Sequence, residues 1–133
     1  MPIIVYNRNN ENHSGDKNNY PIYRPNILSN PYTHIKDRTT LASYVVDTRE
    51  EAIQQYDHYF DVMYSGNKEF RRVINEIYEK YKNGETIYLE CYCVPAPCHG
   101  NIIAKKLQRM LVRELAQKTK NECQKEMKAD TTL

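Results

Sequence analysis

The fold is decided by residues 86–100, which read TIYLECYCVPAPCHG. From residue 86 to 93 apolar and polar side chains alternate strictly, which predicts a β-strand with one face against a core. The core face carries Ile87, Leu89, Cys91 and Cys93. The opposite face carries Thr86, Tyr88, Glu90 and Tyr92. Prolines at positions 95 and 97 prevent the strand from continuing, and a long helical pattern begins at about His99.

Other elements follow from the same kind of pattern. Residues 2–6 predict a first buried strand and residues 20–23 a short one, whereas the proline-containing stretch 24–32 predicts an ordered loop. Thr48 and Glu51 have the spacing of a capping box and predict a helix to about residue 64, and a second amphipathic helix follows and ends before Gly84. Residues 33–47 stay unassigned. This order predicts an α/β fold, a small, mostly parallel central sheet flanked by helices in a Rossmann-like sandwich.

The 133 residues suit a single domain, 1–133. Residues 7–19 contain six asparagines and no aliphatic side chain, so we expect a mobile loop there, in which His13 has no evident role. Beyond Ala116 the apolar stripe fades, which predicts a polar helical extension at 117–133.

Composition narrows the class of protein. No apolar run approaches the roughly 18 residues needed to span a bilayer, and no signal peptide is evident, so we expect a cytoplasmic protein with reduced cysteines and no membrane partner. Residues 99–133 hold eight Lys and Arg against four Asp and Glu, a mild excess that is typical of a solvated helix face. Nucleic acid is therefore not the expected partner. A homo-oligomer stays compatible with the sequence.

The candidate chemistry lies where the strand meets the helix. Cys91 is expected to be a small core residue, but Cys93 at the strand exit and Cys98 at the helix start are placed for function. A helix N-terminus stabilises a thiolate or binds an anion, and His99 is then a base or a phosphate donor. We take Cys93, Cys98 and His99 as candidate catalytic residues. Zinc at Cys91, Cys93, Cys98 and His99 is a weaker alternative because no second Cys-x-x-Cys pair is present.

The motif Leu-x-Cys-x-Cys-x-Pro-x-x-Cys-His-Gly at residues 89–100 resembles the signature of the domain of unknown function 4326 family, which occurs in bacteria and their phages. A second family motif, Gly-Arg-Pro-Ser-x-x-Gly-Asn-Pro-Phe, is similar to residues 23–32, where Tyr23 and Ser29 replace the glycines. The helix start at residues 49–52 is a third similarity. The resemblance covers about residues 20–110 and implies a shared site rather than a particular reaction.

We expect the two motifs to form one pocket at the carboxyl edge of the sheet. Its ligand-binding residues would be Arg24, which pairs with an anion, Asn30, which contacts a polar edge, and Gly100 and Asn101 at the helix start. A nucleotide or phosphorylated small molecule suits these ligand-binding residues. In a phage the ligand would be a host nucleotide or defence signal. Two alternatives stay open: a thiol-dependent hydrolase or transferase acting on such a ligand, and a metal-stabilised protein or nucleic-acid interaction module. The sequence does not decide whether the protein is an enzyme.

Overall fold

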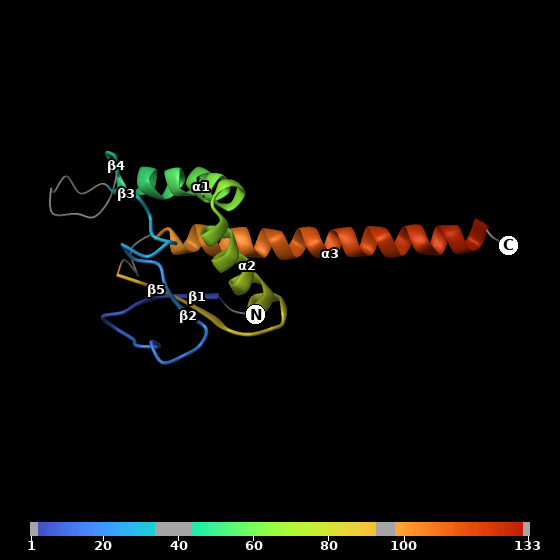
Figure 1. Cartoon of the computed structure of the whole chain (residues 1–133), viewed down its shortest axis with the longest axis horizontal. Helices are drawn as coiled ribbons and strands as arrows, with labels where there is room; N and C mark the ends of the chain where they lie inside the picture. Colours follow the sequence, from blue (N-terminus) through green and yellow to red (C-terminus); the bar gives the residue numbers. More distant parts are fainter. Residues whose placement is uncertain (1–2, 34–43, 93–97, 132–133) are drawn as a thin grey trace.

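Three parallel strands form the central sheet of the computed structural model, which describes residues 3–33, 44–92 and 98–131. They are β1 (Ile3–Asn7), β2 (Asn19–Pro21) and β5 (Ile87–Cys91), in the order β1-β5-β2 (Figure 1). Leu89 of the middle strand is in register with Val5 on one side and Tyr20 on the other. Because the strands are parallel, all three carboxyl ends lie at the same edge of the sheet.

The core lies on one face of this sheet, as the alternation in the middle strand predicts. Ile87, Leu89 and Cys91 are buried there against three helices, namely α1 (Arg49–Gly66), α2 (Lys68–Lys82) and α3 (Gly100–Thr131). Each helix contributes large apolar side chains to this core, among them Tyr56, Phe60, Phe70, Ile74, Ile77, Ile103 and Leu107. The predicted α/β class, with a small parallel sheet flanked by helices, is confirmed.

The opposite face of the sheet is met by the asparagine-rich loop. Its imidazole at His13 stacks on the Tyr88 ring with centroids 4.0 Å apart and meets the Tyr6 ring edge-on at 4.8 Å. Short polar side chains shape its turns, since Asn7 Oδ1 accepts from the Asn9 amide. The mobility of this loop stays a prediction, but His13 has a defined place in it.

Both of the first two helices begin at side-chain caps. Thr48 Oγ1 accepts from the Glu51 amide at 3.1 Å, which confirms the capping interaction, while the Glu51 carboxylate reaches back to the amide of Asp47. The first helix, predicted to end at about residue 64, ends at Gly66, and the side chain of Asn67 then caps α2 through the amide of Phe70.

A second, two-stranded sheet lies beside the start of α1 and pairs β3 (Tyr32–Thr33) with β4 (Tyr44–Val45) in parallel. The loop before β3 is tied to α1, since the Tyr56 hydroxyl donates to the Leu28 carbonyl at 2.7 Å. The described loop contains no helix, as its prolines predict.

The last helix is much longer than the sheet it packs on. It passes the sheet and extends away from the rest of the molecule (Figure 1), and residues 112–122 are all exposed. The helix therefore continues through the polar residues that the sequence marks as an extension. None of the described helices combines the length and apolarity needed to cross a bilayer.

Candidate functional site

The cysteine-histidine motif and the segment after β2 meet at the carboxyl edge of the sheet. His99, next to the first residue of α3, places its Nε2 2.9 Å from the carbonyl oxygen of Ile22. Because a carbonyl can only accept, this nitrogen carries the proton. Ile22 is two residues before Arg24, so this hydrogen bond brings the chain segments of the two predicted motifs side by side.

The Cys98 side chain lies in space between the His99 ring and the first backbone amide of α3. Its Sγ lies 3.7 Å from His99 Nδ1 and accepts from the Gly100 amide at 3.4 Å. Since Nε2 donates to the carbonyl of Ile22, Nδ1 of a neutral ring faces the thiol as an acceptor. The Tyr56 ring packs edge-on against the imidazole at 4.7 Å. The two side chains are only 2% and 8% exposed, so the pair has thiol-imidazole geometry but is closed to solvent.

Of the other two cysteines in the motif, one lies in the core and the other lies outside the described residues. Cys91 is buried in the apolar core and free of any disulfide, as expected for a small core residue. Cys93 lies outside the described residues. Among the residues that are described, no group of three or more potential metal ligands comes together. Zinc binding at Cys91, Cys93, Cys98 and His99 stays a prediction.

Asn30 holds the proline-rich loop in place. Its Nδ2 donates to the Ala52 carbonyl at 3.0 Å, its Oδ1 accepts from the Tyr32 amide, and the residue is buried. Its backbone carbonyl accepts from Arg24 Nη1 at 2.8 Å. Both ends of the Asn30 amide are thus engaged with the backbone, and the loop that it anchors orients Arg24. A direct contact between Asn30 and a ligand stays a prediction.

Gly100 and Asn101 differ in their surroundings. A Cβ on Gly100 would lie 2.8 Å from Val5 Cγ1 and 2.9 Å from Ile22 Cδ1, so the absence of a side chain lets α3 approach the sheet closely. Asn101 is exposed at the start of the helix. Gly100 therefore sets the position of the helix start, and Asn101 is accessible there.

A buried carboxylate that sequence reasoning did not single out lies next to this edge. Glu90, near the end of the middle strand, is 0% exposed. Its oxygens accept from the Tyr6 hydroxyl at 2.7 Å, from Arg8 Nη1 at 3.0 Å and from Asn19 Nδ2 at 3.2 Å. The only sequence signal was a glutamate on the polar face of an otherwise well-buried strand.

The hydrogen bonds decide the charge of this carboxylate. Burial by itself would raise the pKa of Glu90, but the donors Tyr6, Arg8, Asn19 and Tyr23 outweigh burial, and the pKa lies below its ordinary value. Burial and the Glu90 hydrogen bond together raise the pKa of Tyr6 to about 12. Glu90 is therefore ionised and Tyr6 neutral at physiological pH.

The outer part of the network is open to solvent. The Arg8 side chain is 42% exposed and also reaches the Tyr23 hydroxyl at 3.5 Å. The Tyr23 ring lies 4.9 Å from the ring of Tyr92, which is 48% exposed. We call the set Arg8, Tyr23, Arg24, Tyr92 and the α3 start at residues 98–101 the strand-end site.

Comparison with known families adds one finding. Residues 5–109 match the model of the family described as domain of unknown function DUF4326. The chain belongs to this family. No curated protein and no solved structure matches it.

The DUF4326 match includes every residue of the strand-end site and the Glu90 network, whereas residues 110–133 lie beyond it. The matched region thus covers the sheet except the first two residues of β1, the first two helices and about the first third of α3. The exposed part of that helix lies outside the matched region.

Proposed function

We propose that this DUF4326 protein binds a nucleotide or another phosphorylated small molecule at the strand-end site. The proposal rests on one observation: the carboxyl ends of three parallel strands, two arginine-bearing segments and the N-terminus of a long helix meet at one edge. Open α/β sheets bind ligands at the carboxyl ends of their strands.

Two arginines supply the attraction for phosphate. Arg8 uses Nη1 for Glu90 and Tyr23, and Arg24 uses Nη1 for the Asn30 carbonyl. A guanidinium has five N–H donors, so each arginine is oriented by its protein contact and retains donors for a ligand. Arginine forks pair with phosphate oxygens in bidentate geometry, and the positive end of the α3 dipole adds to the attraction.

Two tyrosines supply a flat surface. The Tyr92 ring is about half exposed and lies against Tyr23, whose hydroxyl is held by Arg8. Nucleobases stack on aromatic rings of this kind, and each such contact contributes about 1–3 kcal/mol. A base on Tyr92 with its phosphates toward the arginines is the binding mode we favour.

The test is a titration of the purified protein with nucleoside phosphates and sugar phosphates by isothermal calorimetry. For the ligand that binds best, Arg24→Ala and Arg8→Ala are each expected to weaken affinity about tenfold or more, because each removes a charge-assisted hydrogen bond. Arg72→Ala is the matched control, since this guanidinium is exposed on α2 and pairs with Glu69. Equal affinities for all three variants, or no binding to the panel, would overturn the proposal.

We place this binding in the cytoplasm, the host cytoplasm for a phage-encoded chain. Nucleotides are found there, and within the described residues Cys91 and Cys98 are not joined in a disulfide, which agrees with a reducing compartment.

A second function, a thiol-dependent hydrolase or transferase acting on the same ligand, is favoured by the geometry of Cys98. Its sulfur faces the Nδ1 of His99 and accepts a backbone amide at a helix start, an arrangement that stabilises a thiolate. Labelling with iodoacetamide tests this reading: rapid modification of native Cys98 well below pH 8, together with lost turnover in Cys98→Ser, supports it. Labelling of Cys98 only after unfolding would contradict it.

A further inference from the structure

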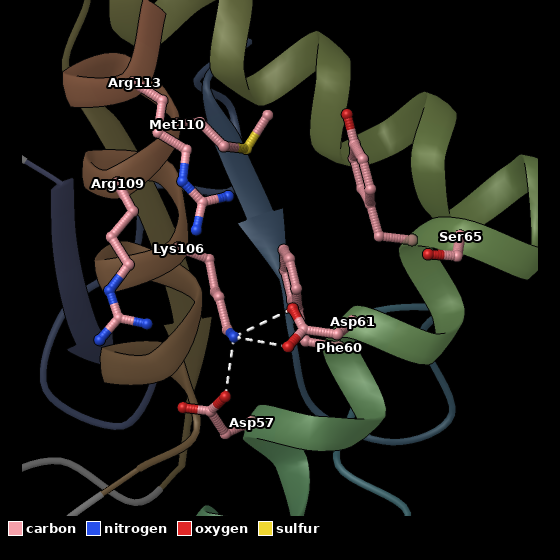
Figure 2. Close-up of a pocket in the computed structure, with 9 residues that line it drawn as sticks. Asp57, Phe60, Asp61, Ser65, Lys106, Arg109, Met110 and Arg113 are labelled. Atoms are coloured by element: carbon pink, nitrogen blue, oxygen red, sulfur yellow. Dashed lines mark hydrogen bonds and ion pairs between the residues drawn. The ribbon is translucent and has the colours of Figure 1, made fainter. Parts of the chain in front are cut away.

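A cavity separate from the strand-end site lies between α1 and α3. Its volume is about 450 Å³, within the range of small-molecule sites. Helix α1 contributes Asp57, Phe60, Asp61, Tyr64 and Ser65, and α3 contributes Lys106, Arg109, Met110 and Arg113. Figure 2 shows the two helices as opposing walls, one acidic and one basic.

Lys106 ties the two walls together. Its Nζ lies 2.7 Å from Asp57 Oδ1 and 3.0 Å from both oxygens of Asp61, and its side chain is only 11% exposed (Figure 2). The ammonium also lies 5.8 Å from the centre of the Phe60 ring. Both carboxylates of the acidic wall are thus engaged by Lys106, and the lysine acts as a strut rather than as a free charge.

Arg109 and Arg113 have no carboxylate partner among the described residues. Within the residues that the structure describes, neither guanidinium makes a hydrogen bond or an ion pair. They lie four residues apart on α3, so their side chains leave the same face of the helix. In Figure 2 the Arg113 guanidinium extends toward the space between the helices, next to Met110. The cavity holds three cationic side chains against two carboxylates and so carries an excess positive charge on its α3 wall.

We propose that this α1–α3 cavity is a second anion site, which takes a phosphoryl group on a small molecule through Arg109 and Arg113. Two guanidiniums from successive helical turns pair with a group that offers several oxygens, as phosphate does. Phe60 and Met110 provide apolar surface beside it. Asp57 and Asp61 on the opposite wall repel an extended polyanion, which favours a compact phosphate-bearing ligand over a nucleic-acid strand.

The test uses inorganic pyrophosphate as the probe in isothermal calorimetry at constant ionic strength. It is run on the Arg8→Ala/Arg24→Ala protein, so that the strand-end site does not contribute and the two proposals fail independently. Adding Arg109→Ala and Arg113→Ala is expected to weaken pyrophosphate binding about tenfold or more. The matched control adds Lys105→Ala and Lys118→Ala, which remove two charges from the same helix without touching the cavity, and should leave the affinity unchanged within about twofold.

Three results would overturn the second site. The first is that pyrophosphate does not bind the Arg8→Ala/Arg24→Ala protein. The second is that both pairs of α3 substitutions weaken pyrophosphate affinity equally, which would attribute binding to the overall charge of the helix. The third is that a short single-stranded oligonucleotide binds through Arg109 and Arg113 while pyrophosphate does not. The last result would assign this helix face to nucleic acid instead. The substituted side chains are exposed apart from Arg24, which is half-buried, and circular dichroism checks that each variant folds.

Discussion

Replacing Glu90 with glutamine is expected to destabilise the protein more than any other single charge removal on the sheet. Glu90 Oε2 accepts from Tyr6 and Asn19 and its Oε1 accepts from Arg8. A glutamine side chain keeps one acceptor oxygen and turns the other position into an NH₂ donor, which then faces a donor in either orientation. At least one hydrogen bond to a fully buried group is lost, together with the negative charge that holds Arg8.

The magnitude follows from the kind of bond that is broken. A hydrogen bond to a charged group contributes about 1.5–3 kcal/mol, and removing one partner of a fully buried ion pair costs about 3–5 kcal/mol. Because Arg8 is partly exposed and can turn to water, we expect a cost between these two ranges, about 2–4 kcal/mol for Glu90→Gln. The control Glu76→Gln removes a half-exposed carboxylate that accepts from Tyr20, and should cost less than about 1 kcal/mol.

Urea unfolding followed by far-ultraviolet circular dichroism measures both free energies. The pH dependence fixes the sign: the folded pKa of Glu90 lies below the unfolded value of about 4.3, so the stabilisation is complete above that value and is lost as pH falls through the folded pKa. The difference between wild type and Glu90→Gln should therefore be constant from about pH 6 to 8 and shrink on acidification. A Glu90→Gln protein as stable as wild type at neutral pH would refute the account of this network.

Two further predictions concern α3 and the glycines. Gly100→Ala should cost about 1–3 kcal/mol in the same urea unfolding assay, because its methyl group would overlap Val5 and Ile22. Gly66→Ala, with nothing within 4 Å, should be neutral or slightly stabilising. Equal effects would contradict the close approach of α3 to the sheet. Removing residues 117–133 should leave the urea midpoint essentially unchanged, because the described side chains beyond Ala116 are exposed and bond only within the helix. A marked loss of stability would show that this extension packs on the domain.

Local signals in the sequence were enough for the three helices and the strands of the central sheet, but not for β3 and β4. The alternation around Leu89 predicts the middle strand and its buried face, and the Thr48 and Glu51 spacing predicts the first turn of α1. These signals work because strand burial and helix capping depend on residues that are close in the chain. Boundaries shifted by a residue or two, as at β2, where the predicted strand at 20–23 is observed at Asn19–Pro21.

The contacts that build the sites depend on residues far apart in the chain. Tyr6 and Glu90 are separated by 84 positions, and their hydrogen bond requires β1 and β5 to be neighbours in one particular register. Lys106 likewise meets Asp57 across 49 positions. A sequence pattern marks Glu90 only as a polar residue on a strand and Lys106 only as a charged residue on a helix. Their partners become identifiable once strand order and helix packing are known.

The strand-end site was predicted in part for the same reason. The sequence motifs identify Arg24, Cys98 and His99, and the hydrogen bond from His99 to Ile22 brings the segments that carry them together. Arg8, Tyr23 and Tyr92 were not chosen from the sequence, because each looks like an ordinary polar or aromatic residue until the strand ends converge. Asn30 was chosen, and the structure gives it a backbone-anchoring role that its side-chain type alone does not reveal.

The most direct test of ligand binding at the strand-end site is to follow backbone amide resonances by NMR while the best-binding nucleoside or sugar phosphate is added. The account predicts shifts concentrated at residues 8, 22–24, 92 and 98–101, with these shifts lost in the Arg8→Ala/Arg24→Ala protein. A ligand that binds but shifts only amides elsewhere, or that shifts this edge equally in the double variant, would contradict it.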